Sequence, residues 1–163
     1  MISFVKKIVQ VSQNRTTYRV GLLQDKVYRI LKKHTSSALE KYCISTVEWA
    51  YLGLLHDNPA GIRLVHIAKA LEVEPPFVTD ITNKFLIRGA SEKLVVVEAD
   101  PKDKRAKLVK LSVVGHSFVN EVEVYLREKT KPLLADISPG DLLGYLSVLS
   151  KIVENSNEKH KSK

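Results

Sequence analysis

Apolar residues recur at helical spacing through the segment that follows Thr16. The residues that fall on one face of this segment are Val20, Leu23, Val27, Ile30 and Leu31. A stripe of this kind is typical of an amphipathic helix that buries one side. The pattern predicts a long first helix from about Thr16 to about Glu40.

The next helix is expected to begin at a capping box, Ser45 to Glu48. In such a box the serine oxygen accepts a hydrogen bond from an early backbone amide, and the glutamate reaches back to the serine N–H. Trp49, Leu52 and Leu55 form the predicted buried face. Turn-forming residues over 56–61 end this helix.

Two short helical patterns then follow one another closely. Their apolar positions are Leu64, Ile67, Ala68 and Leu71 in the first, and Val78, Ile81 and Phe85 in the second. Pro75 and Pro76 stand near the start of the second helix, where a missing N–H does least harm, and Gly89 is suited to stop it. With only residues 72–74 between them, the two helices are predicted to form a helix-turn-helix.

The period changes after this pair of helices. Residues 94–98 are apolar and β-branched, and residues 107–111 alternate, so both segments are predicted strands. They flank the charged segment 99–106, which contains Pro101. A hairpin with a basic tip directly after a helix-turn-helix is the wing of a winged helix.

Helical spacing returns after Ser112. Phe118, Val122, Tyr125 and Leu126 share one face and Leu133 follows them, and Pro132 kinks or ends this helix. Ser138 and Pro139 are suited to the N-cap and first turn of a last helix. The apolar face of that helix comprises Leu142, Tyr145, Leu146, Leu149 and Ile152.

The chain is therefore expected to be mainly α, an α+β winged helix flanked by helices. We expect an N-terminal extension and first dimerisation helix over 1–40, a DNA-binding lobe over 41–112, C-terminal dimerisation helices over 113–155 and a disordered tail over 156–163. The terminal helices have more apolar surface than so small a central lobe can cover. An intertwined homodimer would bury the rest, and the alternative is a monomer in which these helices pack back.

Charge favours a polyanionic partner. The 163 residues hold 26 Lys and Arg against 18 Asp and Glu, a formal net charge of +8, and residues 1–33 hold eight of the cations against Asp25 alone. Such an excess suits nucleic acid or an anionic membrane surface, and a solvated basic face is the alternative.

The single cysteine, Cys43, excludes an intramolecular disulfide. No segment is apolar and long enough to span a membrane, so a cytoplasmic, nucleoid-associated protein is expected.

The segment from Asp100 to Gly115 resembles the wing signature of the MarR family of bacterial and archaeal transcription regulators. It reads DPKDKRAKLVKLSVVG, and it is similar to the family pattern DPxDxRAxxVxL(S/T)xxG without a gap. The capping box before Trp49 and the helix pair from Leu64 to Gly89 match the family more weakly. The resemblance covers about Thr16 to Val153. It implies a homodimeric regulator, more often a repressor, on a palindromic double-stranded DNA operator.

The resemblance also implies where DNA is read. The wing arginine of the family enters the minor groove and the aspartate two residues earlier orients it, roles that carry over to Arg105 and Asp103. An arginine fork suits a narrow, electronegative minor groove, whereas an isolated surface pair would contribute little. The full set of expected DNA-binding residues is Thr79, Asn83, Lys84 and Arg88 on or after the recognition helix, and Lys102, Asp103, Lys104 and Arg105 on the wing.

Two departures from the family pattern leave an alternative open. Gly89 and Asp103 are 14 residues apart, more than the family usually has, which predicts longer wing arms. The recognition helix carries Asp80, which is unfavourable beside phosphates unless it binds a cytosine amino group or pairs with Lys84, and Phe77, which either contacts a thymine methyl or is buried. The alternative is a winged-helix scaffold that has lost specific DNA binding and acts through protein or ligand binding.

Other chemistry has little support in the sequence. The family often holds a small aromatic or anionic effector in a crevice that Tyr28, His34, Tyr42 and Trp49 would border, but core packing accounts for these residues better and no ligand is assigned to them. Cys43 does not stand where oxidant-sensing relatives carry their cysteine. No histidine stands at metal-ligand spacing, and no phosphate loop or nucleophile motif is present. We expect no enzyme activity, no cofactor and no metal.

Overall fold

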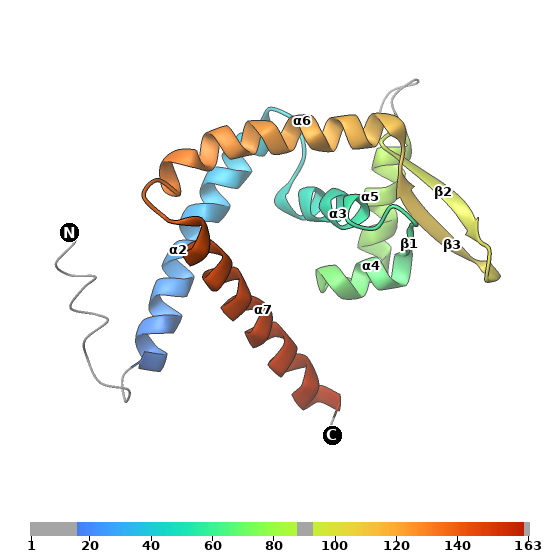
Figure 1. Ribbon diagram of the computed structural model, residues 1–163. Coiled ribbons are helices and arrows are strands. Elements are labelled where there is room, and N and C mark those ends of the chain that lie inside the picture. The colour runs from blue at the N-terminus through green and yellow to red at the C-terminus, as the bar shows by residue number, and fades with distance from the viewer. Residues whose placement is uncertain (1–15, 88–92, 162–163) are drawn as a thin grey trace. The chain divides into compact units, whose positions relative to one another are not determined.

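The computed structural model describes residues 16–87 and 93–161, which form two compact units (Figure 1). The first unit extends to Lys129 and the second begins at Thr130. The elements of the first are α2 (Thr16–Glu40), α3 (Thr46–His56), β1 (Ile62–Arg63), α4 (Leu64–Leu71), α5 (Pro75–Ile87), β2 (Val95–Asp100), β3 (Asp103–Leu111) and α6 (Val113–Thr130). The second holds the 3-10 turn η2 (Lys131–Leu133) and α7 (Pro139–Lys161). The expected winged helix is confirmed.

The core of the first unit lies where α3 meets the pair α4 and α5. The capping box at the start of α3 is present, since Ser45 Oγ accepts from the Glu48 N–H at 3.2 Å and Glu48 Oε2 accepts from the Ser45 N–H at 2.7 Å. It sets the rotation of α3 so that Tyr51, Leu52 and Leu55 are fully buried. Trp49, expected on the same face, is only half-buried against this core.

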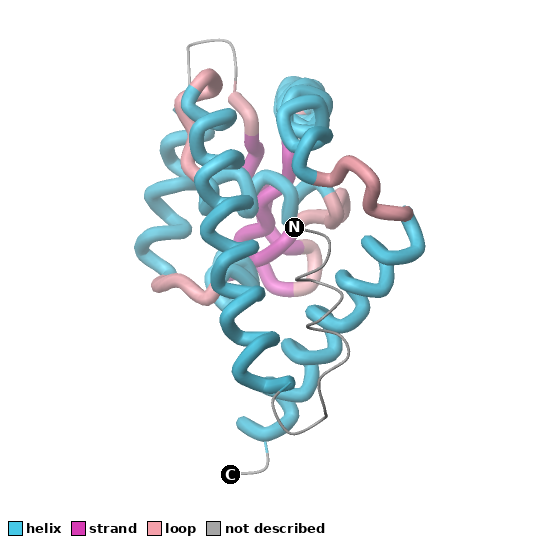
Figure 2. Tube along the Cα trace, turned by 90° about the vertical axis from the view of Figure 1, so that its left-hand side faces the viewer, coloured by secondary structure: helices cyan, strands magenta, loops and turns pink. Residues whose placement is uncertain are grey.

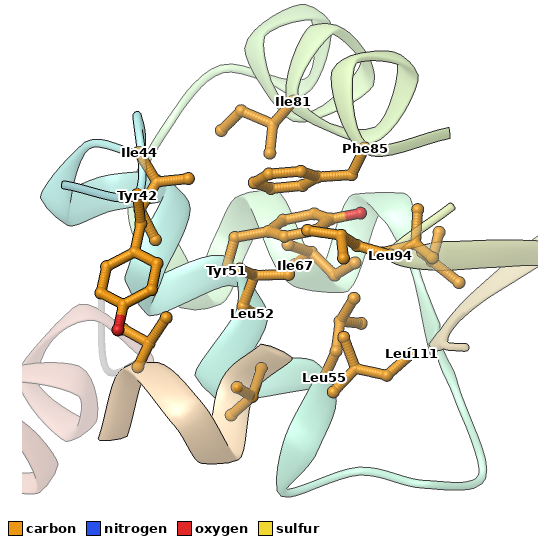
Figure 3. Close-up of a cluster of buried hydrophobic side chains, with 14 of the residues drawn as sticks. Tyr42, Ile44, Tyr51, Leu52, Leu55, Ile67, Ile81, Phe85, Leu94 and Leu111 are labelled. Carbon is orange, nitrogen blue, oxygen red and sulfur yellow. The ribbon is translucent and has the colours of Figure 1, made fainter. Parts of the chain in front are cut away.

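Side chains from α4 and α5 complete that core (Figure 3). Ile67 of α4 and Phe85 of α5 are fully buried, and the rings of Phe85 and Tyr51 lie 5.9 Å apart between centroids. The turn between the helices is set by Glu72, which adopts a left-handed conformation (φ 54°). The Val73 N–H then donates to the Ala68 carbonyl at 3.0 Å. This closes the helix-turn-helix that the apolar pattern predicts.

The sheet is antiparallel with the order β1-β3-β2. The register pairs Val95 with Leu111 at the base and Asp100 with Asp103 at the tip, with an irregularity between Ala99 and Asp100. Only Pro101 and Lys102 connect β2 and β3. Figure 2 shows the strands of the sheet in magenta. The charged segment expected as a long tip is therefore mostly strand, and the hairpin projects from the helices (Figure 1). The two-residue strand β1 was not expected, because it is too short to show a period.

The last residue of the wing motif has a steric role. The Gly115 N–H donates to Ser112 Oγ at 2.9 Å, and this caps the start of α6. A Cβ atom at Gly115 would lie 2.0 Å from the Leu94 carbonyl oxygen, which is far inside van der Waals contact. The Ser-x-x-Gly ending of the motif therefore caps α6 with Ser112 and lets the first turn of this helix approach the Leu94 backbone, immediately before β2.

Proline and serine delimit the last two helices as expected. α6 ends at Thr130, and Pro132 lies in η2. In the second unit, Ser138 Oγ accepts from the Asp141 N–H at 3.1 Å at the start of α7. α7 continues to Lys161, past residue 155 where a disordered tail was expected, because no glycine or proline follows Gly144 to end it. Within the described ranges, no helix is both long and apolar enough to cross a bilayer.

Candidate nucleic-acid interface

The second helix of the helix-turn-helix presents a polar face to solvent. On α5, Val78, Ile81, Thr82 and Phe85 are buried, and Thr79 and Asn83 are exposed as expected of groove-facing residues. Thr79 Oγ1 donates to the Pro75 carbonyl at 3.2 Å, so this hydroxyl has a partner within its own helix. Phe77, for which two placements were open, has 45% of its surface exposed, and Asp80 is also exposed. Arg88 lies outside the described residues.

A buried hydrogen bond holds α5 onto α3. Tyr51 Oη lies 2.8 Å from Thr82 Oγ1, and Thr82 Oγ1 donates to the Val78 carbonyl at 2.8 Å. The threonine hydrogen is used in the second bond, so the tyrosine hydroxyl donates in the first. Burial raises the pKa of Tyr51 to about 12. The pair fixes the rotation of α5 and thereby the set of residues that faces solvent.

This buried hydroxyl predicts a loss of stability in alkali. The folded protein holds Tyr51 neutral up to about pH 12, whereas the unfolded chain ionises it near pH 10. The stabilisation is therefore present below pH 10 and is lost as the pH rises toward 12, by about 1.4 kcal/mol at pH 11. Tyr51→Phe should cost about 1 kcal/mol at neutral pH, through the lost hydrogen bond, and should flatten this dependence.

Urea unfolding at a series of pH values from 7 to 11 measures both effects. Tyr18→Phe is the matched control, because Tyr18 is the same residue type on α2 and its side chain is exposed. Equal alkaline losses in Tyr51→Phe and in the unsubstituted protein would contradict the assignment.

Lys84 lies elsewhere than its sequence position suggests. It was expected to face the groove, with pairing to Asp80 as a second option, but its amine lies 2.6 Å from Glu48 Oε1 on α3. The same amine donates to the Cys43 carbonyl at 3.4 Å. Burial by itself raises the pKa of Glu48, but the hydrogen bonds from Lys84 and Ser45 outweigh it and leave the pKa lowered. Lys84 thus ties α5 to the corner between α2 and α3.

The base of the wing tip is held by the buried carboxylate of Asp100, which the sequence indicates only as the first residue of the wing motif. Asp100 Oδ2 accepts from Arg63 Nε at 2.7 Å and lies 2.6 Å from Arg63 Nη2, while Oδ1 accepts from the Lys102 N–H at 2.8 Å. The Lys102 amide, and then Arg63, lower the pKa of Asp100. Asp100 opens the wing motif, and this network gives that position a structural reason. Arg63, at the end of β1, had no signal of its own.

The tip of the wing presents Arg105 to solvent. The Arg105 side chain is 97% exposed, and its Nε lies 3.8 Å from Asp103 Oδ1. The same carboxylate oxygen accepts from the Arg105 backbone N–H at 3.1 Å. Asp103 therefore holds the backbone of Arg105 more closely than its guanidinium. Lys102 is also exposed at the tip, and the side chain of Lys104 lies outside the described residues.

The residues expected to border an effector crevice differ in their burial. Tyr28 and His34 are exposed on α2, and Trp49 is half-buried on α3. Tyr42 is buried in an edge-to-face cluster with Phe118 and Tyr125, at centroid distances of 5.7 and 5.6 Å. Cys43, next to it, is exposed. Over the described ranges, no cluster of three or more histidine, cysteine, aspartate or glutamate residues is placed to hold a metal ion.

Solved structures of other proteins share this fold. No protein-family model matches the sequence. The fold is similar to apo MarR from E. coli, with a TM-score of 0.67 and 19% identity over 82% of this chain and 95% of that one. It is similar to MepR of S. aureus in a complex with DNA, with a TM-score of 0.63 and 24% identity over 83% of this chain and 96% of that one. It is also similar to CouR of Rhodococcus jostii RHA1 bound to p-coumaroyl-CoA, with a TM-score of 0.71 and 19% identity over 86% of this chain and 95% of that one. The chain has the winged-helix fold of the MarR-family transcriptional regulators.

Proposed function

We propose that the protein is a non-enzymatic transcription regulator of the MarR family that binds double-stranded DNA as a homodimer. The observation that carries the proposal is the pairing of two exposed elements on one compact unit. α5 is anchored by Tyr51 and Glu48 with a polar face outward, and the wing carries Arg105 fully in solvent. A helix for the major groove beside a basic hairpin for the minor groove is the docking geometry of a winged helix-turn-helix.

Each candidate residue has a role in this proposal. Thr79 and Asn83 contact base edges in the major groove, and Arg105 enters the flanking minor groove. Lys102, Lys104 and Arg88 contribute charge toward phosphates. Asp103 positions Arg105 through its backbone, and Lys84 acts through Glu48 on the placement of α5.

Exposed apolar surface on the terminal helices supports the homodimer. On α2 the exposed large apolar residues are Tyr18, Val20, Leu22, Leu23, Val27, Tyr28 and Ile30. On α7 they are Leu143, Tyr145, Leu146, Val148, Ile152 and Val153. Patches of this kind are rare on soluble monomers and mark surfaces that a partner covers. Two copies that bury them would present two copies of α5 to half-sites about 10 bp apart on a palindrome.

Regulation by a small molecule is part of the same proposal. The related CouR structure holds p-coumaroyl-CoA, and that of BpsR concerns control of DNA binding by 6-hydroxynicotinic acid. An aromatic or anionic effector that changes the separation of the two α5 helices would shift a pre-existing equilibrium between binding and non-binding dimers. A repressor released by such a ligand is the form we propose.

The exposed residues Asp80 and Phe77 on α5 favour a second candidate, a scaffold without specific DNA recognition. Selection of duplexes from a random library, followed by anisotropy titration at several salt concentrations, separates the two candidates. A regulator enriches a palindrome and binds it about 10³-fold or more tightly than random duplex at equal salt. Equal affinity for the two duplexes selects the scaffold, and a monomeric mass at micromolar concentration counts against the dimer.

A further inference from the structure

A hollow lies between the inner side of the wing and the first turn of α4. Its volume is about 410 Å³, and its lining comprises Arg63, Leu64, Val65 and His66 on one side and Asp103, Arg105, Ala106 and Lys107 on the other. We call it the wing hollow. Both sides belong to the first unit, and the pairing of β1 with β3 holds them together, with Arg63 opposite Leu108. The wing hollow is therefore a fixed feature of the lobe.

The charges in the wing hollow favour an anion. Arg63, Arg105 and Lys107 contribute three cations, and Asp103 contributes one carboxylate that already accepts from the Arg105 backbone N–H. Asp100 neutralises Arg63 through the two short contacts described above. Lys107 is exposed and has no ion-pair partner among the residues that the structure describes. Its amine is consequently the charge that is available to a ligand.

The position of the wing hollow beside Arg105 identifies the anion. Arg105 and Lys107 are two residues apart on β3, so they emerge on one face about 7 Å from each other. In a duplex whose minor groove receives Arg105, one of the two strands would run along this face. The lining combines apolar walls, Leu64, Val65 and Ala106, with the His66 ring, a hydrogen-bond donor. This suits a sugar-phosphate unit.

We propose that the wing hollow receives a backbone phosphate of the bound duplex, with Lys107 as its cationic contact and His66 as a hydrogen-bond donor. The inference rests on the proposed DNA-binding function and adds a site to it. Each phosphate that a protein neutralises adds about 0.9 to the slope of log affinity against log salt. Two copies of Lys107 in a dimer thus contribute about 1.8 to that slope.

Lys107→Gln tests the proposal, with Lys110→Gln as the matched control. Lys110 lies on the same strand and carries the same charge, but its amine is 2.6 Å from Glu98 and it does not line the wing hollow. We expect Lys107→Gln to lower the salt slope by about 1.8 on selected and random duplexes alike, because a phosphate contact ignores sequence. Lys110→Gln should leave the slope unchanged. Equal slopes in the two variants overturn the proposal.

Neutral methylphosphonate linkages locate the contact on DNA. In the selected duplex, a methylphosphonate at one position per half-site should weaken binding by the unsubstituted protein. The same linkage should not weaken binding by Lys107→Gln any further. The absence of such a position overturns the wing hollow while leaving the proposed function intact. A protein that binds neither duplex overturns the function itself.

Inorganic phosphate, titrated at constant ionic strength, distinguishes a free anion from the DNA backbone. One outcome is that phosphate shifts the His66 NMR resonances in the unsubstituted protein and not in Lys107→Gln, while both proteins show the same salt slope on DNA. That result would make the wing hollow a site for a free anion, and the proposal would be wrong.

Discussion

Arg105→Ala should weaken binding to the selected palindrome on the order of a hundredfold without changing the fold. A charge-assisted hydrogen bond contributes about 1.5 kcal/mol or more, and a dimer loses two such contacts, so the loss is about 3 kcal/mol. The side chain is 97% exposed and its ion pair with Asp103 is long, at 3.8 Å, so the free energy of unfolding should change by less than about 0.5 kcal/mol. Anisotropy titration and urea unfolding measure the two quantities.

Three further variants separate the shape of this side chain, its charge and its contact with Asp103. Arg105→Lys keeps the charge and loses the planar fork, so it should retain part of the affinity. Arg127→Ala removes the same charge from an exposed position on α6 and should have little effect. Asp103→Asn keeps an acceptor for the Arg105 N–H, so it should cost much less than Arg105→Ala. Unchanged affinity in Arg105→Ala would remove the wing from the interface.

Local signals explain how much of this fold could be predicted from the sequence. Apolar spacing and the capping box depend on residues three or four apart, and they gave α2 its bounds and α3 its start. The spacing of Gly89 and Asp103 indicates longer wing arms, but the strand pattern reached only 94–98 and 107–111, because charged residues such as Asp103 and Arg105 hide the alternation on which a strand assignment depends. β1 was missed because two residues carry no period.

The candidate site depends on contacts that no local pattern contains. The Arg63–Asp100 contact joins residues 37 positions apart, and the Lys84–Glu48 contact joins residues 36 apart. In each pair the sequence does not indicate that the basic residue and the carboxylate meet. Residue type predicts that Lys84 binds DNA, and the contact of its amine with Glu48 on α3 is visible only in the fold. Arg105 was predicted correctly as an exposed wing residue because its motif is contiguous.

The Lys84–Glu48 contact predicts a large loss of stability when the lysine alone is removed. Lys84→Met leaves the carboxylate of Glu48, whose side chain is only 12% exposed, without its cation. Breaking a fully buried pair costs about 3–5 kcal/mol, and the partial exposure of Lys84 reduces this to about 2 kcal/mol. Glu48→Gln keeps the capping box, since glutamine also serves at this position, and removes the charge.

A double-mutant cycle isolates the pair. The loss in the double variant should be smaller than the sum of the two single losses by about 1 kcal/mol, since Glu48→Gln removes the charge that Lys84→Met strands. Additive losses, measured by urea unfolding, would mean that the two side chains do not interact in solution.

DNA binding by the same variants distinguishes a positioning role for Lys84 from a phosphate contact. If Lys84 acts through α3, Lys84→Met and Glu48→Gln should each lower affinity for the selected palindrome and leave the salt slope unchanged, because no phosphate contact is lost. If Lys84 binds phosphate, Lys84→Met should lower the slope by about 0.9 for each copy. In that case Glu48→Gln should strengthen binding, because it frees the amine. Glu48→Gln is the decisive variant, because the two roles predict opposite changes in its affinity for DNA. If Glu48→Gln binds the palindrome more weakly with an unchanged salt slope, the ion pair between Lys84 and Glu48 sets the tilt of α5 from α3 and makes no contact with DNA.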